Sequence, residues 1–189
     1  MVQPSGDRSA ESRAGADSRA TARLLWTALA ILLADQAVKK LVVTLMALGE
    51  SVDVLGPVVR ITRTENTGAA FGILRGMGFV FVGVSAAASI AIIAMRRRIA
   101  ALARSEQLGF TLVLGGALGN LVDRVRHGAV VDFIDIGVRD LRWPAFNVAD
   151  SAIVIGVTLL AVRFLFFQHP GVPGGGAQHG PSGSGPGAP

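Results

Sequence analysis

The sequence predicts a membrane all-α fold, in which a bundle of four transmembrane helices carries a small β-sheet outside the membrane. The composition is the first observation that favours this fold. Hydrophobic residues make up 51% of the 189 residues, and charged residues reach only 16%, against about 25% in soluble domains. The mean hydropathy of +0.53 agrees. The second observation is that four apolar stretches follow one another along a chain long enough for about one domain.

The two ends of the chain differ from the part between them. Residues 1–22 are rich in Ser, Ala, Arg and Asp without a period, and residues 169–189 consist mostly of Gly, Pro and Ser. Such segments cannot bury enough apolar surface to offset the entropy lost on ordering. We therefore expect a disordered cytoplasmic tail, a membrane domain over residues 23–168, and a disordered Gly/Pro-rich tail.

Each apolar stretch predicts one transmembrane helix. The stretches are Leu24 to about Leu48, Phe79 to Met95, about Leu108 to Val122, and about Ala152 to Phe167. A bilayer core of about 30 Å requires about 20 helical residues, so flanking residues must extend the last three. No small-x-small cleavage site follows the first stretch, which favours a retained span over a cleaved signal peptide.

The basic residues lie in loops and tails. Arg96, Arg97 and Arg98 form a dense cluster directly after the second apolar stretch, which predicts that this loop and both termini are cytoplasmic. No aromatic residues interleave with the arginines to stack on bases, so no nucleic-acid partner is expected. The chain has no Cys, which excludes disulfides, thiolate metal sites and cysteine nucleophiles.

The loop from Gly49 to Gly78 predicts the sheet. Val52, Val54, Val58 and Ile61 flank a Gly56-Pro57 pair, a pattern typical of two short strands joined by a turn. We expect this first outer loop to form a small extracytoplasmic β-cradle above the bundle.

Acidic residues gather between the third and fourth stretches. Asn120-Leu-Val-Asp123 closes the third stretch and Asn147-Val-Ala-Asp150 opens the fourth. Residues three apart share a helix face, so each Asn can hydrogen-bond near its Asp, and both pairs can face one region. Helix capping is the simpler explanation for one such pair alone. Charged groups at membrane depth are costly and mark function by default.

Asp132 lies in an apolar segment, between Val130-Val131 and Phe133-Ile134. This setting disfavours the charged carboxylate and should raise its pKa. If Asp132 and Asp150 meet, like charges prevent both from ionising, and the pair shares a proton. Such a pair can activate water for peptide hydrolysis without a metal. The 18-residue separation does not establish the contact.

Other polar groups allow two interpretations. Asp35 and Lys39 are an i, i+4 pair that is either a salt bridge tolerated in lipid or part of a site. Asn66 to Gly72 is either a turn entering the second helix or a segment whose Asn66 amide meets an extended peptide. Gly115 to Gly119 predicts a small-residue helix interface. We expect Arg124 to pair with a carboxylate or a lipid headgroup.

These residues fall into four blocks whose order resembles the lipoprotein signal peptidase (signal peptidase II) family, the membrane aspartyl proteases of bacteria. The resemblance covers about Leu24 to Phe167. The blocks are Asp35-Gln-Ala-Val-Lys39, Asn66-Thr-Gly-Ala-Ala-Phe-Gly72, Gly115 to Arg124 with Val130 to Phe133, and Phe146-Asn-Val-Ala-Asp-Ser151. Each block alone is moderately specific, but all four in order make coincidence very improbable.

The resemblance implies a membrane endopeptidase of the bacterial inner membrane, with its site near the outer leaflet and no cofactor or metal. The implied catalytic pair is Asp132 and Asp150. The supporting or substrate-binding positions are Asp35, Asn66, Asn120, Asp123, Arg124 and Asn147. The implied reaction removes the signal peptide of a prolipoprotein just before a Cys that carries diacylglycerol. We expect a monomer that contacts membrane lipids and binds the antibiotic globomycin.

Two other functions fit parts of the sequence. A metal-dependent enzyme acting on lipid headgroups could hold Mg²⁺ with Asp132, Asp135 and Asp140. A small transporter could line a path with Asp35 and Asp150, although the sequence shows no inverted repeat of broken helices. Sensitivity to a chelator and an uptake assay would distinguish these from a metal-free protease.

Overall fold

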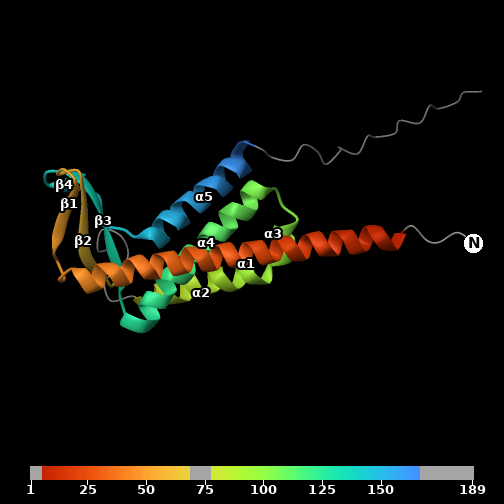
Figure 1. Ribbon diagram of the computed structural model, residues 1–189, viewed down its shortest axis with the longest axis horizontal. Helices are drawn as coiled ribbons and strands as arrows, with labels where there is room; N and C mark the ends of the chain where they lie inside the picture. The colour runs from red at the N-terminus through yellow and green to blue at the C-terminus, as the bar shows by residue number, and fades with distance from the viewer. Residues whose placement is uncertain (1–5, 69–77, 167–189) are drawn as a thin grey trace, which may run out of the picture.

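The computed structural model describes residues 6–68 and 78–166. Within these ranges the chain forms five helices and a small antiparallel sheet (Figure 1). The order of elements along the chain is α1 (Gly6–Leu45), β1 (Ser51–Leu55), β2 (Val59–Asn66), α2 (Gly78–Ala94), α3 (Arg96–Ala100), α4 (Arg104–His127), β3 (Val130–Val138), β4 (Leu141–Arg142) and α5 (Val148–Phe166).

The four predicted helices are present as α1, α2, α4 and α5. Flanking residues extend α4 and α5 beyond their apolar stretches, as expected. Among the described residues, α4 and α5 are long and apolar enough to cross a membrane, and α2 is apolar over 17 residues. In α1 the charged residues set into the apolar run lower its hydropathy. The helices therefore support a membrane protein, as does the exposure of many large apolar side chains along them.

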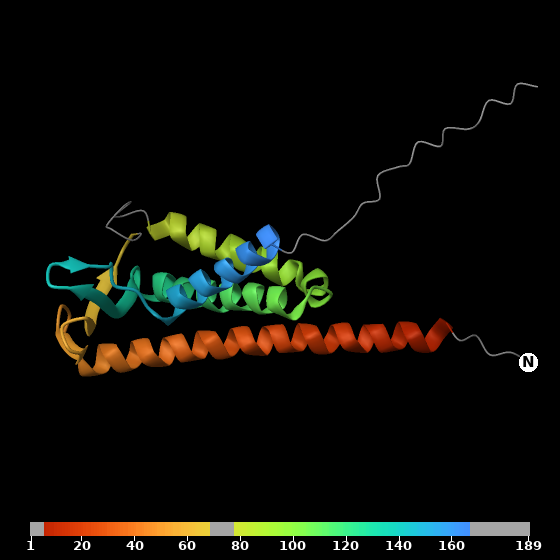
Figure 2. The same cartoon turned by 90° about the horizontal axis from the view of Figure 1, so that it is seen from above.

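Helix α1 begins much earlier than the sequence pattern suggests. We expected residues 1–22 to be a disordered tail, but the backbone is helical from Gly6 (Figure 2). The segment contains several Ala and Arg residues, which favour helix, and it continues a helix already nucleated by the apolar run. Ala20 and Leu24 are also buried, which adds a tertiary contact. Residues 1–5 and the expected tail at 169–189 lie outside the described residues.

The sheet is larger than predicted. Strands β1 and β2 form the expected hairpin in the first outer loop, but the strand order β1-β2-β3-β4 shows that the segment between α4 and α5 supplies the other two strands. Strand β3 pairs along β2, with Thr64 opposite Asp132 and Asn66 opposite Val130. The apolar segment around Asp132 was not predicted as a strand. This pairing brings residues from the two outer loops together at one end of the bundle (Figure 1).

Helix α4 is the centre of the bundle and packs against α1, α2 and α5. Small residues make this possible, as the predicted glycine-rich interface requires. A Cβ atom on Gly115 would lie 2.7 Å from Cβ of Ile31 in α1, and one on Gly119 would lie 2.7 Å from Oδ2 of Asp35. The bundle therefore holds α1 and α5 close enough to α4 for their polar side chains to meet.

Candidate active site

The start of α5 is fixed beside strand β3 by backbone hydrogen bonds. The Ile134 N–H donates to the Phe146 carbonyl at 2.8 Å, and the Phe146 N–H donates to the Ile134 carbonyl at 3.1 Å. These bonds place Asn147, the residue before α5, next to Asp132. The fold thus brings together the Asp132 segment and the Asn147-Val-Ala-Asp150 segment, which lie 15 or more residues apart in the sequence.

Asn147 and Asp150 form a reciprocal cap at the first turn of α5. The Asp150 N–H donates to Oδ1 of Asn147 at 2.9 Å, and the Asn147 N–H donates to Oδ2 of Asp150 at 3.3 Å. The capping interpretation is therefore correct for this pair. Asn147 also has a second contact, since its Nδ2 donates to Oδ1 of Asp132 at 2.7 Å. One buried amide thus links the two acidic residues.

Asp132 is buried on β3 and accepts a hydrogen bond at each carboxyl oxygen. Besides Asn147, Asn66 on the neighbouring strand donates from Nδ2 to Oδ2 at 3.0 Å. Burial raises the pKa of Asp132 to about 6, and the charge of Asp150 acts in the same direction. The bonds from Asn66 and Asn147, and the charge of Lys39, act against this rise in pKa. The apolar setting seen in the sequence therefore has the expected effect.

A hydrogen bond from Asn120 on helix α4 positions the side chain of Asp150. Asn120 donates from Nδ2 to Oδ1 of Asp150 at 2.7 Å. The orientation of the Asn120 amide is fixed, because its Oδ1 accepts from Lys39 Nζ and from Asn147 Nδ2, each at 3.2 Å. The expected bond between Asn120 and Asp123 is not among the contacts of the described residues. These two side chains instead share Lys39 as a partner.

Lys39 is the centre of a buried ionic cluster behind the two acidic residues. Its ammonium lies 2.7 Å from Oδ2 of Asp35 and 2.8 Å from Oδ2 of Asp123, and the Lys39 residue is only 3% exposed. Asp35 also accepts the Ala149 N–H at 2.9 Å, which caps α5. Asp123 accepts from Gln36 at 2.7 Å and from the Val131 N–H at 3.3 Å. The cluster joins α1, α4, β3 and α5.

Arg124 has a different partner from the first of the two that were expected. We expected it to pair with a carboxylate or a lipid headgroup, and no carboxylate of the described residues lies within 4.0 Å of its guanidinium. The guanidinium instead lies 5.2 Å from the centre of the Phe81 ring, and Nη2 contacts the Gly68 carbonyl at 3.5 Å. Its Nε is buried without a hydrogen-bond partner among the described residues. Among the described residues, Phe81 and the turn after β2 therefore take the place of a carboxylate partner.

The acidic pair opens into a cavity of about 550 Å³. Its polar wall contains Asn66, Arg124, Asp132 and Asp150, and its apolar wall contains Trp143, Pro144, Val154 and Ile155. Val154 and Ile155 are well exposed on the outer side of α5. The cavity therefore joins two carboxyl groups to an apolar surface that faces away from the bundle.

The predicted residues fall into two groups. Asn66, Arg124, Asp132 and Asp150 line the cavity, with Asn120 and Asn147 directly behind, whereas Asp35 and Asp123 belong to the cluster around Lys39. Gln36, Trp143 and the apolar wall were not predicted as parts of the site. Lys39 was noted only for its i, i+4 spacing from Asp35, and that spacing was the available signal. Residues 69–72 of the expected turn lie outside the described residues.

The magnesium hypothesis lacks a matching cluster. No group of three His, Cys, Asp or Glu side chains suited to a metal ion occurs within residues 6–68 and 78–166. Asp135 is instead paired with Arg142 at 2.6 Å and accepts a bond from Thr62. Asp132 and Asp135 thus have separate sets of partners.

Comparison with known proteins identifies the family. The family model for signal peptidase (SPase) II matches residues 27–166. The lipoprotein signal peptidase of Geobacillus kaustophilus is 43% identical over 145 residues, which cover 77% of this chain and 94% of that protein. The lipoprotein signal peptidase of Desulforapulum autotrophicum is 38% identical over 159 residues, covering 82% and 98%.

The fold has relatives among solved structures. Two structures of a bacterial membrane enzyme obtained by the in meso method each superpose with a TM-score of 0.69, at 34% and 35% identity. They cover 80% and 78% of this chain, and 94% and 95% of their own length. The sequence matches and the shared fold show that this chain belongs to the signal peptidase II family of proteases, the lipoprotein signal peptidases.

Proposed function

We propose that the protein is an aspartic endopeptidase that removes the signal peptide from prolipoproteins just before a diacylglyceryl-modified Cys, with Asp132 and Asp150 as its catalytic pair. The family supports signal-peptide removal. The observation that carries the aspartic mechanism is that two carboxyl groups, linked through Asn147, line one cavity.

In the proposed reaction the pair carries one proton. Asp132 holds it, because burial and the neighbouring charge raise its pKa. Ionised Asp150 takes a proton from water as the water oxygen attacks the scissile carbonyl carbon, and Asp132 donates its proton to the carbonyl oxygen. The proton on Asp150 then moves to the amide nitrogen as the C–N bond breaks, and one of the two hydroxyl groups on the former carbonyl carbon returns its proton to Asp132. The products are a new carboxyl end on the signal peptide and a free amine on the lipidated Cys.

The surrounding amides hold the two carboxyl groups for this reaction. Asn120 and Asn147 both donate to the pair, and Lys39 fixes the orientation of the Asn120 amide. Arg124 lines the cavity, and its guanidinium carries N–H groups that can donate to a carbonyl of an extended peptide. This arrangement is a preorganised set of donors around the reacting carbonyl.

The apolar wall fits a substrate with a lipid anchor. Val154 and Ile155 lie on the exposed face of α5, so a diacylglyceryl chain in the bilayer can lie against them while the peptide enters the polar part of the cavity. We propose that α1, α2, α4 and α5 all cross the inner membrane, with both termini cytoplasmic and the sheet outside. We expect the protein to act as a monomer.

The test uses the purified protein and a diacylated prolipoprotein, incubated with and without a chelator. The expected product is the shorter lipoprotein whose first residue is the lipidated Cys, identified by mass spectrometry, in equal yield under both conditions. Cleavage at another bond would refute the proposed substrate. Loss of cleavage with the chelator, restored by added metal, would refute the metal-free mechanism.

A further inference from the structure

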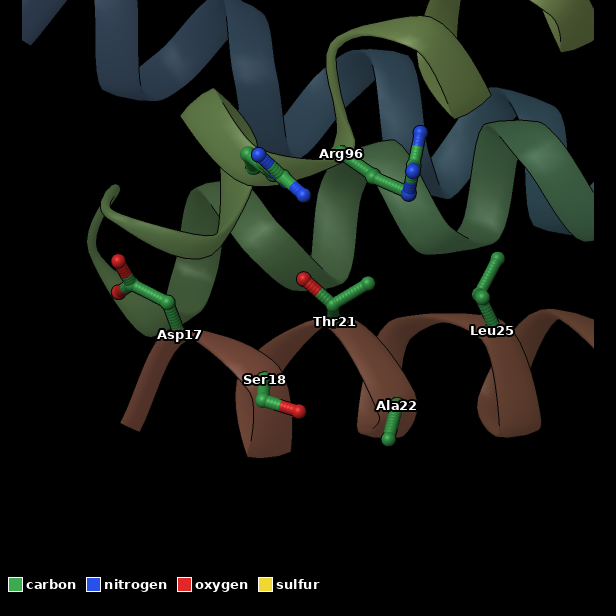
Figure 3. Close-up of a pocket in the computed structure, with 7 residues that line it drawn as sticks. Asp17, Ser18, Thr21, Ala22, Leu25 and Arg96 are labelled. Carbon is green, nitrogen blue, oxygen red and sulfur yellow. The ribbon is translucent and has the colours of Figure 1, made fainter. Parts of the chain in front are cut away.

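A second cavity, of about 590 Å³, lies at the end of the bundle opposite the sheet. It lies between the early part of α1 and the junction of α2 and α3 (Figure 3). Its lining includes Asp17, Thr21 and Leu25 from α1, and Arg96 and Arg97 from the junction. None of these residues belongs to the candidate active site.

The three residues of α1 follow one another along a single face. Asp17, Thr21 and Leu25 are spaced by four, and their side chains point from α1 toward the neighbouring helices (Figure 3). The rise from Asp17 to Leu25 is about 12 Å. Along this rise the lining changes from a carboxylate through a hydroxyl to an apolar side chain.

The cavity lining contains both signs of charge. Among the described residues, no salt bridge within 4.0 Å joins Asp17 to Arg96 or Arg97. Arg96 donates from Nη1 to the Ile93 carbonyl at 3.0 Å, so its other N–H groups can bind a ligand. A lining with two guanidinium groups and one carboxylate complements a ligand that has an anionic and a cationic end. Guanidinium forks suit phosphate oxygens.

The cavity lies at the edge of the exposed apolar surface. On α1 this surface begins with Leu25 and Trp26, which is 69% exposed. It ends with Met95, which lies between α2 and α3 and directly precedes Arg96. Helix α4 runs between the level of this cavity and the level of the candidate active site. The rise along α4 from Arg104 to Arg124 is about 30 Å, which equals the thickness of a bilayer core. The cavity is thus at the depth of phospholipid headgroups in the other leaflet.

We propose that this cavity binds the headgroup of a phospholipid that carries a primary amine. Arg96 and Arg97 bind the phosphodiester together with the Thr21 hydroxyl, and the Asp17 carboxylate accepts hydrogen bonds from the ammonium group. The acyl chains run along Leu25 into the apolar surface. The order along α1, with the carboxylate outermost and Leu25 innermost, matches the order of amine, phosphate and acyl chain in such a lipid.

The test measures lipid retention by the full-length protein. The protein is exchanged into detergent with equal amounts of phosphatidylethanolamine, phosphatidylcholine and phosphatidylglycerol of identical acyl chains, and the retained lipid is counted by native mass spectrometry. The expected result is retention of phosphatidylethanolamine about tenfold above phosphatidylcholine, whose methylated amine has no N–H donor. The Asp17→Asn variant should lose this preference.

A double variant supplies the matched control. Arg96→Gln with Arg97→Gln should lower phosphatidylethanolamine retention about tenfold. Arg98→Gln with Arg104→Gln removes the same charge nearby but outside the cavity lining and should retain the wild-type level. Equal losses in the two double variants would show general attraction to charge and overturn the proposal, as would preferential retention of phosphatidylglycerol by the wild type. Prolipoprotein processing by each variant verifies folding independently.

Discussion

Replacing Asp35 with Ala should destabilise the protein strongly. The change removes one of the two carboxylates that neutralise buried Lys39, and Asp35 itself is 0% exposed. It also removes the acceptor of the Ala149 N–H at the start of α5. A lost charge-assisted contact costs about 1.5–3 kcal/mol, and an unsatisfied buried donor costs about 1–3 kcal/mol. Because the two losses affect one network, we expect a total of about 3–5 kcal/mol.

The Asp35→Asn variant separates the two contributions. Asn keeps an oxygen that can accept the Ala149 N–H but removes the negative charge, so the expected loss is smaller, about 1–3 kcal/mol. Asp53→Ala is the control, because Asp53 is an exposed residue of β1 that forms an ion pair with Arg60 of β2. An exposed pair of this kind contributes about 0–1 kcal/mol.

The assay is unfolding of the purified protein in mixed micelles by increasing SDS, followed by far-UV circular dichroism, together with protein abundance in membranes. The proposed stabilising role of Asp35 would be refuted if Asp35→Ala were no less stable than Asp53→Ala. Processing is then measured per folded molecule. Normal turnover of folded Asp35→Asn protein is expected from a supporting role, and lost turnover at normal abundance would place Asp35 in the catalytic machinery.

Three further perturbations test other parts of the account. Gly119→Ala places a Cβ 2.7 Å from Oδ2 of Asp35 and should cost about 1–3 kcal/mol in the same unfolding assay, whereas Gly83→Ala, with no atom within 4 Å, should not destabilise. Turnover should fall as the pH rises through about 6, where Asp132 loses its proton. The Asn66→Ala variant removes a hydrogen bond that lowers the pKa of Asp132, so the fall in kcat/KM should move to higher pH. A shift to lower pH would contradict the assignment of Asp132 as the proton donor. Val154→Asn makes the apolar wall polar and should raise KM for a diacylated substrate while leaving an unlipidated peptide unaffected; equal effects on both would refute the lipid contact.

The helices could be predicted from the sequence because bilayer-length apolar stretches have few alternative structures. The start of α1 could not. Residues 6–22 lack an apolar period, and their helix depends on propagation from the neighbouring span and on packing of Ala20. A composition typical of disorder does not reveal either contribution.

The sheet could be predicted only in part. The hairpin of β1 and β2 has local signals in its alternating valines and Gly56-Pro57 turn. Strand β3 is a short apolar run whose pairing partner, β2, lies more than 60 residues earlier in the chain. Such long-range pairing has no local signature, so Asp132 was recognised by its apolar neighbours and not by its strand.

The candidate site, like the sheet, could be predicted from the sequence only in part. The acidic residues and their Asn partners could be selected because polar groups are costly near lipid. The convergence of Lys39 on both Asp35 and Asp123 depends on how closely α1 approaches α4, which the glycines of α4 permit. The position of Arg124 over Phe81 depends on the packing of α2, and nothing in the spacing of these two residues indicates it.

Processing of a diacylated prolipoprotein by Asp132→Asn and Asp150→Asn variants tests the proposed catalytic pair most directly. Each purified variant is compared with the wild type and with Asp53→Asn, a charge-matched change on the exposed strand β1. We predict that both variants fold and insert normally yet form no shortened product, while Asp53→Asn processes at the wild-type rate. Full processing by either Asp132→Asn or Asp150→Asn would contradict the account.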